Sequence, residues 1–478
     1  MSMIKSFIKF SFGSIVAAGI SFFTTPIITL FILPGEFGRV AIFTLTTSIL
    51  LQVVLAGTDQ GFMRFFYEKD AEDKSDLLWN SILPSFFIWG ILSFGILCFW
   101  KITSRWLIAE EQFLIVALLP VFLLVNLIDR YAFLVIRMQQ KGAIFSLLRI
   151  FASVLNAVFL ITYCIFFSKT FYAIIFAGIF STSIIIIISI IYQRKFWFSK
   201  KVTITIDVIK QLLKYDIPFA PACLMSILFE GIDKIFLRKY NGFEEIGLYS
   251  AAFKIVAILA IVQTGFSMFW TPVSFEHYEK YPNDTSFYEK AYRYLIFVLP
   301  LLGFLIIGFK DLIILIFAKN YRNAASFMPF LVFIPVMYTL TELTCLGIYF
   351  KKKSVWQLFV FGILLVMSFG FNFILVPLLG AKGAAMAVAL SYTAYFFIRT
   401  AASIRLYPMN FHLIKTMFIF LLLYIVAGVN TFITNKFIGI SCAGLAIIVY
   451  MLFNIPIIKD IMAYFRQAAL GNIIKINA

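Results

Sequence analysis

The stretch FIKFSFGSIVAAGISFFTTPIITLFILPGEFGRVAIF, residues 7–43, is an apolar run that is interrupted near its end by Pro34, Gly35 and Glu36. The part before the interruption is long enough to cross a bilayer as a helix, which takes roughly 17–25 apolar residues. A second apolar run begins directly after it. The stretch therefore predicts a membrane-spanning helix, a short corner and the start of a second such helix.

The composition extends this prediction to the whole chain. Of the 478 residues 62% are hydrophobic and 13% are charged, and the mean hydropathy is +0.98. Soluble domains carry about 25% charged residues. A membrane β-barrel would show short alternating segments, whereas this chain shows long unbroken apolar runs. We therefore expect an all-α polytopic membrane protein.

About fourteen apolar runs are long enough to span. Their limits are 7–32, 39–58, 79–100, 112–136, 143–167, 171–192, 215–237, 248–270, 292–316, 326–350, 355–378, 383–404, 412–433 and 437–457. The first run has no small-residue cleavage site typical of a signal peptide.

The net charge of +17 would suggest nucleic acid in a soluble protein. Here Lys and Arg gather in the loops on the side of the N-terminus, which marks cytoplasmic loops. We therefore expect both termini in the cytoplasm, contacts with membrane lipids and no nucleic-acid partner.

The chain contains no motif of a catalytic or metal site. The five cysteines lie singly in apolar runs and the two histidines are far apart, so we predict no metal ion. A Walker A motif is absent, and no loop is long enough for a catalytic domain. We expect a secondary transporter, not an enzyme, without a cofactor; coupling to protons or sodium ions stays open.

Short matches between the two halves indicate an internal repeat. The triplets EFG (36–38) and EIG (245–247) lie 209 residues apart, and Asn156 and Asn372 lie 216 residues apart. Transporters are often built from such repeats. We predict two six-helix lobes in one orientation. The predicted segments are an N-lobe at 1–192, a cytoplasmic linker with an amphipathic helix at 193–214, a C-lobe at 215–404, and two further helices with a cytoplasmic tail at 405–478.

Ionisable residues inside spans are costly and mark functional sites by default. The candidates for the substrate cavity are Arg130, Lys254, Glu230 and Asp233; those for an inner gate are Arg130, Glu342, Asp129, Asp59 and Arg64.

Two hypotheses about these charges leave alternatives open. In the register of the repeat, Arg130 corresponds to Glu342. One alternative is that these two residues pair when the cytoplasmic side closes. The other is that each charge has a partner within its own lobe. Lys254 either bridges to Glu230 or Asp233, or is a free cation that binds a lipid pyrophosphate.

Three stretches resemble one family of exporters. They are LPGEFGRVAIF (Leu33–Phe43), GIDKIFLRKYNGFEEIGLYSAAFKI (Gly231–Ile255) and FNFILVPLLGAKGAAMAVALSY (Phe371–Tyr392). They resemble the corners and hairpins of Wzx-type O-antigen or polysaccharide repeat-unit flippases of the multidrug/oligosaccharidyl-lipid/polysaccharide exporter superfamily. The resemblance implies a MATE-like fold with two six-helix lobes around a central cavity and two C-terminal helices.

The resemblance also implies a function. It points to a flippase that moves undecaprenyl-pyrophosphate-linked oligosaccharide repeat units, of O-antigen (lipopolysaccharide) or capsule type, from the inner to the outer leaflet of the bacterial cytoplasmic membrane by alternating access. Polysaccharide polymerase machinery would be a further partner. The alternatives are a multidrug or cation exporter and a lipid II flippase of the same superfamily, or a scaffold of a polysaccharide-synthesis complex.

Overall fold

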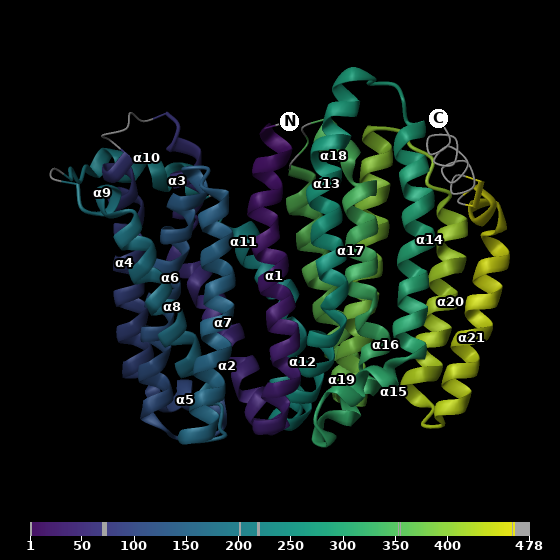
Figure 1. The fold of residues 1–478 in the computed structure, drawn as a ribbon, viewed down its shortest axis with the longest axis horizontal. Helices are drawn as coiled ribbons and strands as arrows, with labels where there is room; N and C mark the ends of the chain where they lie inside the picture. Colours follow the sequence, from purple (N-terminus) through teal and green to yellow (C-terminus); the bar gives the residue numbers. More distant parts are fainter. Residues whose placement is uncertain are drawn as a thin grey trace, which may run out of the picture. The chain divides into compact units, whose positions relative to one another are not determined.

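The computed structural model describes residues 2–68, 74–199, 202–217, 220–351, 353, 355–460 and 462–463, and these form helices and no strand. In chain order the helices (Figure 1) are α1 (Ser2–Phe31), α2 (Pro34–Leu55), α3 (Thr58–Phe65), α4 (Lys74–Cys98), α5 (Trp100–Ile108), α6 (Phe113–Met138), α7 (Gly142–Phe166), α8 (Tyr172–Tyr192), α9 (Arg194–Trp197), α10 (Ile206–Asp216), α11 (Ala220–Tyr240), α12 (Phe243–Val256), α13 (Ile258–Lys280), α14 (Ser286–Gly308), α15 (Lys310–Ile313), η1 (Ile314–Ile316), η2 (Lys319–Ser326), α16 (Met328–Leu331), α17 (Phe333–Thr344), α18 (Leu346–Phe350), α19 (Val355–Leu406), α20 (Leu413–Phe432) and α21 (Lys436–Phe453).

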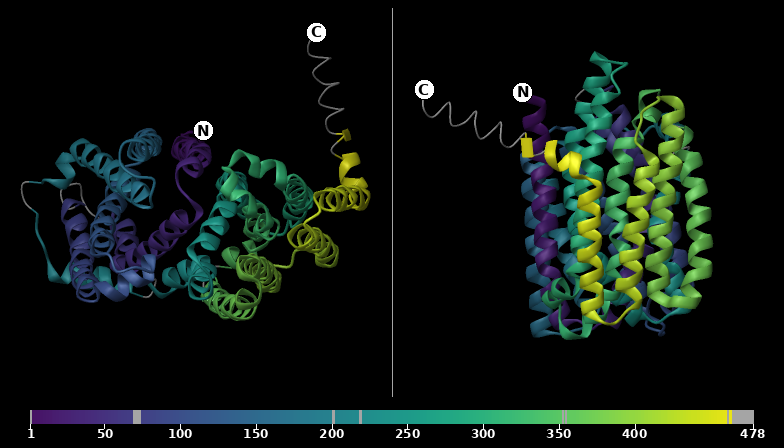
Figure 2. Two further views of the ribbon diagram at one scale, coloured as in Figure 1. Left: turned by 90° about the horizontal axis from the view of Figure 1, so that it is seen from below. Right: turned by 90° about the vertical axis from the view of Figure 1, so that its right-hand side faces the viewer.

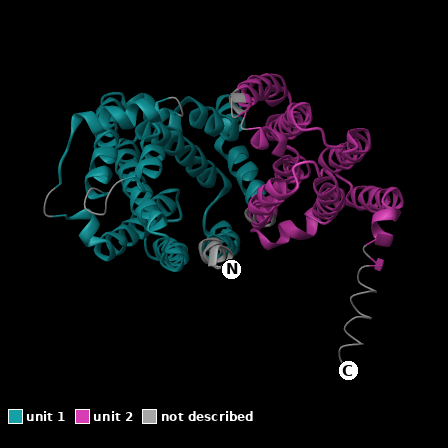
Figure 3. Ribbon diagram, turned by 90° about the horizontal axis from the view of Figure 1, so that it is seen from above, with its two compact units in different colours: residues 1–254 teal, residues 255–478 magenta. Residues whose placement is uncertain are grey.

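The helices form two compact units, residues 1–254 and 255–478 (Figure 3). Within each unit the long helices run side by side along one direction (Figure 2). The contacts group α11 and nearly all of α12 with the helices before them. The division into lobes at 192 and 215, which rests on the repeat, stays a prediction, and the tail beyond residue 463 lies outside the described residues.

Each of the fourteen predicted spans has a helical counterpart. Among the described residues, twelve helices are long and apolar enough to cross a membrane, and the bent pair α10–α11 would make a thirteenth. One of the twelve, α19, contains two predicted spans that are joined at Gly380. Exposed aromatic side chains such as Phe87 and Phe166 cover the helices, as a lipid environment requires. The all-α polytopic fold class is confirmed.

The two helices within α19 meet at a sharp turn. Gly380 has φ 57° and ψ −134°, which side chains rarely allow. A Cβ added to Gly383 would lie 2.0 Å from the carbonyl oxygen of Leu375. The glycines of this segment therefore allow the chain to double back closely on itself.

The short helix α3 lies at one end of the first unit, together with α9 and α10 (Figure 1); we call this end the α3 end, and the opposite one, which contains α5, the α5 end. Gly57, with φ +86°, separates α3 from α2. Phe62 and Phe66 of this segment pack with Leu127 and Tyr131 of α6 in a buried cluster. The cluster fixes α3 on the bundle although it is too short to span.

At the α5 end, the starts of α2 and α12 touch through two glycines. A Cβ on Gly38 would lie 1.9 Å from the carbonyl oxygen of Phe243, and a Cβ on Gly247 would lie 1.8 Å from that of Pro34. Pro34 and Phe243 are separated by the same 209 residues as the two glycines. The contact is thus reciprocal. Gly38 packs against the backbone of Phe243, and Gly247, its counterpart, packs against the backbone of Pro34, the counterpart of Phe243.

This reciprocity has two consequences. It is the arrangement that a two-fold repeat produces when equivalent segments meet at the axis, as in an isologous interface, so it supports the predicted repeat. It also accounts for the grouping of α11 and α12 with the first unit, since the α11–α12 hairpin packs against α2.

We predict that Gly38→Ala and Gly247→Ala each destabilise the protein. The added methyl group would overlap backbone that cannot move freely, and overpacking of this kind costs about 1–3 kcal/mol. Gly35→Ala is the matched control, because nothing lies within 4 Å of its added Cβ. The measurement is thermal unfolding in detergent; equal melting temperatures for all three variants would contradict the close contact.

Candidate functional site

Two charged residues, Asp129 and Arg130, are adjacent in α6. Arg130 binds a carboxylate of α3. Its Nη2 lies 2.5 Å and its Nε 3.1 Å from Oδ2 of Asp59. The Asp59 side chain is 3% exposed, whereas that of Arg130 is 47% exposed. Asp59 is thus neutralised inside the bundle while the guanidinium keeps an open side. Two of the five inner-gate candidates, Arg130 and Asp59, are thus brought together within one unit.

A hydroxyl network beside this pair joins three helices. Thr58 of α3 contacts Tyr131 of α6 at 2.7 Å and Ser85 of α4 at 2.9 Å, in each case oxygen to oxygen. The Tyr131 hydroxyl also donates to the carbonyl of Ser81 at 3.1 Å. Buried networks whose members are all hydrogen-bonded rigidify their surroundings. The network therefore fixes the start of α3 and, with it, the position of Asp59.

Asp129 points to a different neighbour from Arg130, because adjacent residues project about 100° apart around a helix. Nη1 of Arg149, on α7, lies 3.5 Å from Oδ2 of Asp129. The Arg149 guanidinium also lies 3.6 Å from the ring centre of Phe133, a cation–π contact. Asp129 therefore links α6 to α7, away from α3. Arg64, the remaining candidate of this group, forms an ion pair with Glu68.

Glu342, in α17 of the second unit, lies beside a buried arginine. Nη1 of Arg399 is 3.7 Å from its Oε1, and the arginine side chain is 5% exposed. Arg399 donates to the hydroxyls of Tyr349, at 2.8 Å, and Tyr395. Each of Arg130 and Glu342 thus has a partner in its own unit. Pairing between them joins the two units and stays a prediction.

Of the cavity candidates, Asp233 is satisfied locally. It is buried in α11 and accepts hydrogen bonds from the Tyr249 hydroxyl and, at 2.7 Å, from the backbone N–H of Lys234. Tyr249 comes from α12, so this contact ties the two helices of the hairpin together. Asp233 is therefore a structural acceptor in this arrangement.

Lys254 and Glu230 are exposed, and within the described residues no salt bridge joins Lys254 to Glu230 or to Asp233. The bridge considered above is not formed in this structure. Lys254 lies eleven residues after Phe243, or roughly 16 Å along the helix, near the middle of a span. Lys234 is close enough for its charge to act on both Lys254 and Glu230.

Three partners of the candidate residues were not identified from the sequence. Arg149 and Arg399 lie near the predicted cytoplasmic helix ends, where basic residues are common. Tyr249 lies in one of the stretches that resemble the exporter family, but the sequence assigned it no role. Helical spacing gives a side chain's direction along one helix only. No signal in one sequence shows which residue of another helix it will face.

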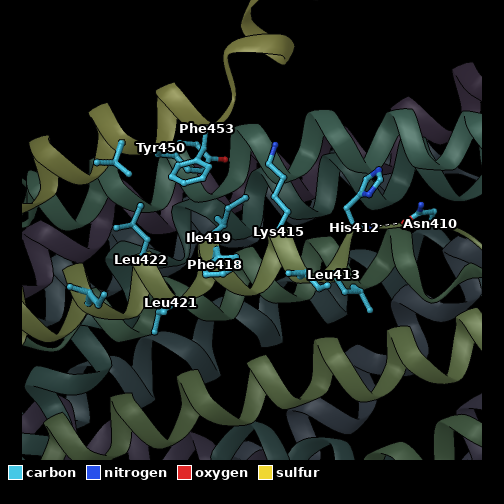
Figure 4. A pocket seen from close by; sticks show the side chains of 13 residues that line it. Asn410, His412, Leu413, Lys415, Phe418, Ile419, Leu421, Leu422, Tyr450 and Phe453 are labelled. Atoms are coloured by element: carbon cyan, nitrogen blue, oxygen red, sulfur yellow. Dashed lines mark hydrogen bonds between the residues drawn. The ribbon is translucent and has the colours of Figure 1, made fainter.

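A cavity of about 780 Å³ lies in the second unit between α20 and α21 (Figure 4). Its lining is mainly apolar, with Phe418, Leu422 and Phe453 among the side chains, and Lys415 and His412 add polar atoms. None of the predicted site residues lines it. A mainly apolar lining with a few polar atoms suits the membrane lipids that are expected as partners.

Comparisons with known proteins place these observations in a family. The sequence model of the family described as polysaccharide biosynthesis protein matches residues 3–277. No curated protein matches the chain. Among solved structures, the lipid II flippase MurJ in an inward closed conformation is 15% identical with a TM-score of 0.71, and the match covers 95% of this chain and 100% of that one.

Two other similar structures are transporters of the MOP superfamily. An outward-facing multidrug resistance MATE family transporter is 18% identical with a TM-score of 0.55, covering 84% of this chain and 94% of that chain. A transporter from Pyrococcus furiosus, described as having a binding pocket of reverse polarity, is 17% identical with a TM-score of 0.54 over the same shares of 84% and 94%. At these identities the likeness shows the fold, and the predicted MATE-like architecture is confirmed.

We predict that Arg130→Gln destabilises the protein by about 1–3 kcal/mol, the cost of leaving a buried acceptor without its partner. Asp59→Asn in the same chain should restore part of this loss, because no buried charge then remains. Arg64→Gln is the control: Arg64 and Glu68 are 52% and 48% exposed, and such pairs contribute about 1 kcal/mol or less. Chemical or thermal unfolding measures all three; equal losses for Arg130→Gln and Arg64→Gln would contradict the assignment.

Proposed function

The chain belongs to the polysaccharide biosynthesis protein family, and from this premise we propose that it is a flippase for undecaprenyl-pyrophosphate-linked oligosaccharide repeat units. It would carry units of O-antigen or capsule type from the inner to the outer leaflet of the bacterial cytoplasmic membrane. Both termini would be cytoplasmic, and polysaccharide polymerases would take over the product. The likeness to MurJ and to MATE transporters supports a flippase or exporter without enzymatic activity.

The observation that carries the proposal is the cation Lys254 in the middle of a span, which forms no salt bridge with any residue that the structure describes. Placing a charged side chain at this depth of the membrane costs free energy, and such residues usually serve a function. Lys234 adds a second cation from the neighbouring helix, held over the ring of Phe253 at 5.5 Å, and its charge acts on Lys254. Two carboxylates of α11 accompany these lysines: Glu230 is exposed, whereas Asp233 is buried and already accepts hydrogen bonds from Tyr249 and Lys234.

A lipid pyrophosphate is the ligand that such a site suits. Its oxygens accept charge-assisted hydrogen bonds, which are stronger than neutral ones and stronger still where water is scarce. The sugars of a repeat unit would need only neutral polar partners. A substrate with a positive charge would be repelled by both lysines, which argues against a cation exporter.

Alternating access requires contacts that form and break at each end. We propose that Arg130 leaves Asp59 and pairs with Glu342 when the cytoplasmic side closes. The open side of the Arg130 guanidinium supports this, since a second carboxylate can approach it before the bond to Asp59 breaks.

We predict that Lys254→Gln lowers flipping of an undecaprenyl-pyrophosphate oligosaccharide in proteoliposomes by about 10- to 100-fold, the equivalent of one charge-assisted hydrogen bond. Lys254→Arg should keep most activity. Lys239→Gln is the matched control, because Lys239 is an exposed cation on the neighbouring helix α11. Full flipping by Lys254→Gln would contradict the role of this lysine, and no flipping by the unchanged protein, together with export of a cationic dye that Glu230→Gln abolishes, would favour a cation exporter instead.

For the gate, we predict that Arg130→Glu and Glu342→Arg each reduce flipping and that the double variant regains part of it. The exchange restores the attraction between the two positions in reversed order. Arg130→Asp with Asp59→Arg is the comparison, since it restores only the pair within the first unit. If this second exchange rescues flipping and the first does not, the pairing of Arg130 with Glu342 is wrong.

A further inference from the structure

The last residue of α10, Asp216, lies against the segment GTDQG of residues 57–61. A Cβ on Gly61 would lie 2.5 Å from Oδ2 of Asp216, and a Cβ on Gly57 would lie 2.8 Å from its backbone oxygen. Gly61 lies within α3 and Gly57 directly before it. They give the end of α10 the room to approach α3 closely.

Asp216 is fully buried, and its carboxyl group has no counter-charge among the residues that the structure describes. Its exposed fraction is 0%, and neither Oδ1 nor Oδ2 forms a hydrogen bond of ordinary geometry in the described part of the chain. The backbone of Gly61 is its polar neighbour. The guanidinium of Arg130 is bound to Asp59, and Oδ1 of Asp59 likewise has no hydrogen-bond partner among the described residues.

The ionisable groups around Asp216 do not supply the missing charge. From α3 the carboxylate of Asp59 acts on it, with repulsion. From α6 come Tyr131, which is neutral, and Arg130, which is bound to Asp59. Cys223 of α11 lies close enough to interact electrostatically with Asp59 and Arg130, and it carries no positive charge that could offset Asp216. Arg64 of α3 forms an ion pair with Glu68, and the ring of Tyr215, next to Asp216 on α10, packs against Phe65. The remaining charged residues of α10 and of the start of α4 have no charge interaction with Asp216 among the described contacts: they are Asp207, Lys210, Lys214, Lys74 and Asp76.

An isolated buried carboxylate is very unfavourable, and such a group binds a proton instead. Counting charges gives the same answer. Asp59, Asp216 and Arg130 carry one negative charge in excess when both carboxyls are ionised, and one proton makes the set neutral. Because Arg130 is bound to Asp59, the proton belongs on Asp216.

We propose that Asp216 is a proton-binding site at the junction of α3 and α10: its carboxyl group holds a proton while the two helices are packed, and releases it when they separate. A metal ion is a poor alternative, because hard cations such as Ca²⁺ take six or more oxygen ligands. Within the described residues no group of three or more His, Cys, Asp or Glu side chains forms a metal site. The proposal does not depend on the substrate that the protein carries.

The test compares thermal unfolding of Asp216→Asn and of the unchanged protein, both purified in detergent, between pH 5 and pH 8. The packed state holds a proton that the unfolded state loses above its ordinary acid range. The unchanged protein should therefore lose stability as pH rises, and the melting temperature of Asp216→Asn relative to it should increase. Asp207→Asn, an exposed acid on the same helix, should differ from the unchanged protein by a constant amount.

Two results would overturn the proposal. The first is a difference between Asp216→Asn and the unchanged protein that stays constant with pH, as for Asp207→Asn. The second is a rise of the melting temperature at pH 8 when sodium chloride replaces choline chloride, in the unchanged protein but not in Asp216→Asn; the site would then bind sodium. If the amide is not tolerated, Asp216→Ser, which is smaller and also neutral, answers the same question.

Discussion

The interaction on which the first unit depends is the pairing of carboxylates among its helices with arginines of neighbouring helices. Asp59 is satisfied by Arg130, and Asp129 by Arg149. The second unit follows the same rule with Glu342 and Arg399. These pairs fix helices relative to one another that apolar packing alone would leave free to slide, since lipid tails are as apolar as the side chains between helices.

The two ends of the first unit are held by different forces. At the α3 end the contacts are ion pairs and hydroxyls, which water or a proton can replace. At the α5 end two backbones touch through Gly38 and Gly247, and the ring of Phe243 lies near the guanidinium groups of both Arg238 and Arg39. The first kind of contact responds to charge and pH. The glycine contact depends on shape and is indifferent to both, but the same end also contains the ion pairs of Arg39 with Glu36 and Glu110, which do respond to charge.

The sequence predicted the helices and the positions of the charges well, because hydropathy and the cost of charge in lipid act on each segment separately. It did not predict partners. Arg130 binds a residue 71 positions earlier, and helical spacing carries no information on such a distance. Asp216 was missed for another reason: it lies where a surface helix enters a span, and a polar residue is unremarkable there. Its burial comes from Gly57 and Gly61, whose effect is visible only in three dimensions.

The reciprocal glycine contact says something about origin as well as packing. If the two halves were separate copies of one six-helix chain, a single glycine would meet its own counterpart across the symmetry axis of a dimer. One substitution would then add two methyl groups to the same crowded point. In the fused chain Gly38 and Gly247 vary independently, yet a side chain on either one fills the shared space. Most positions of the two halves can therefore differ in sequence, but at this point the residue at one position limits the residue at the other.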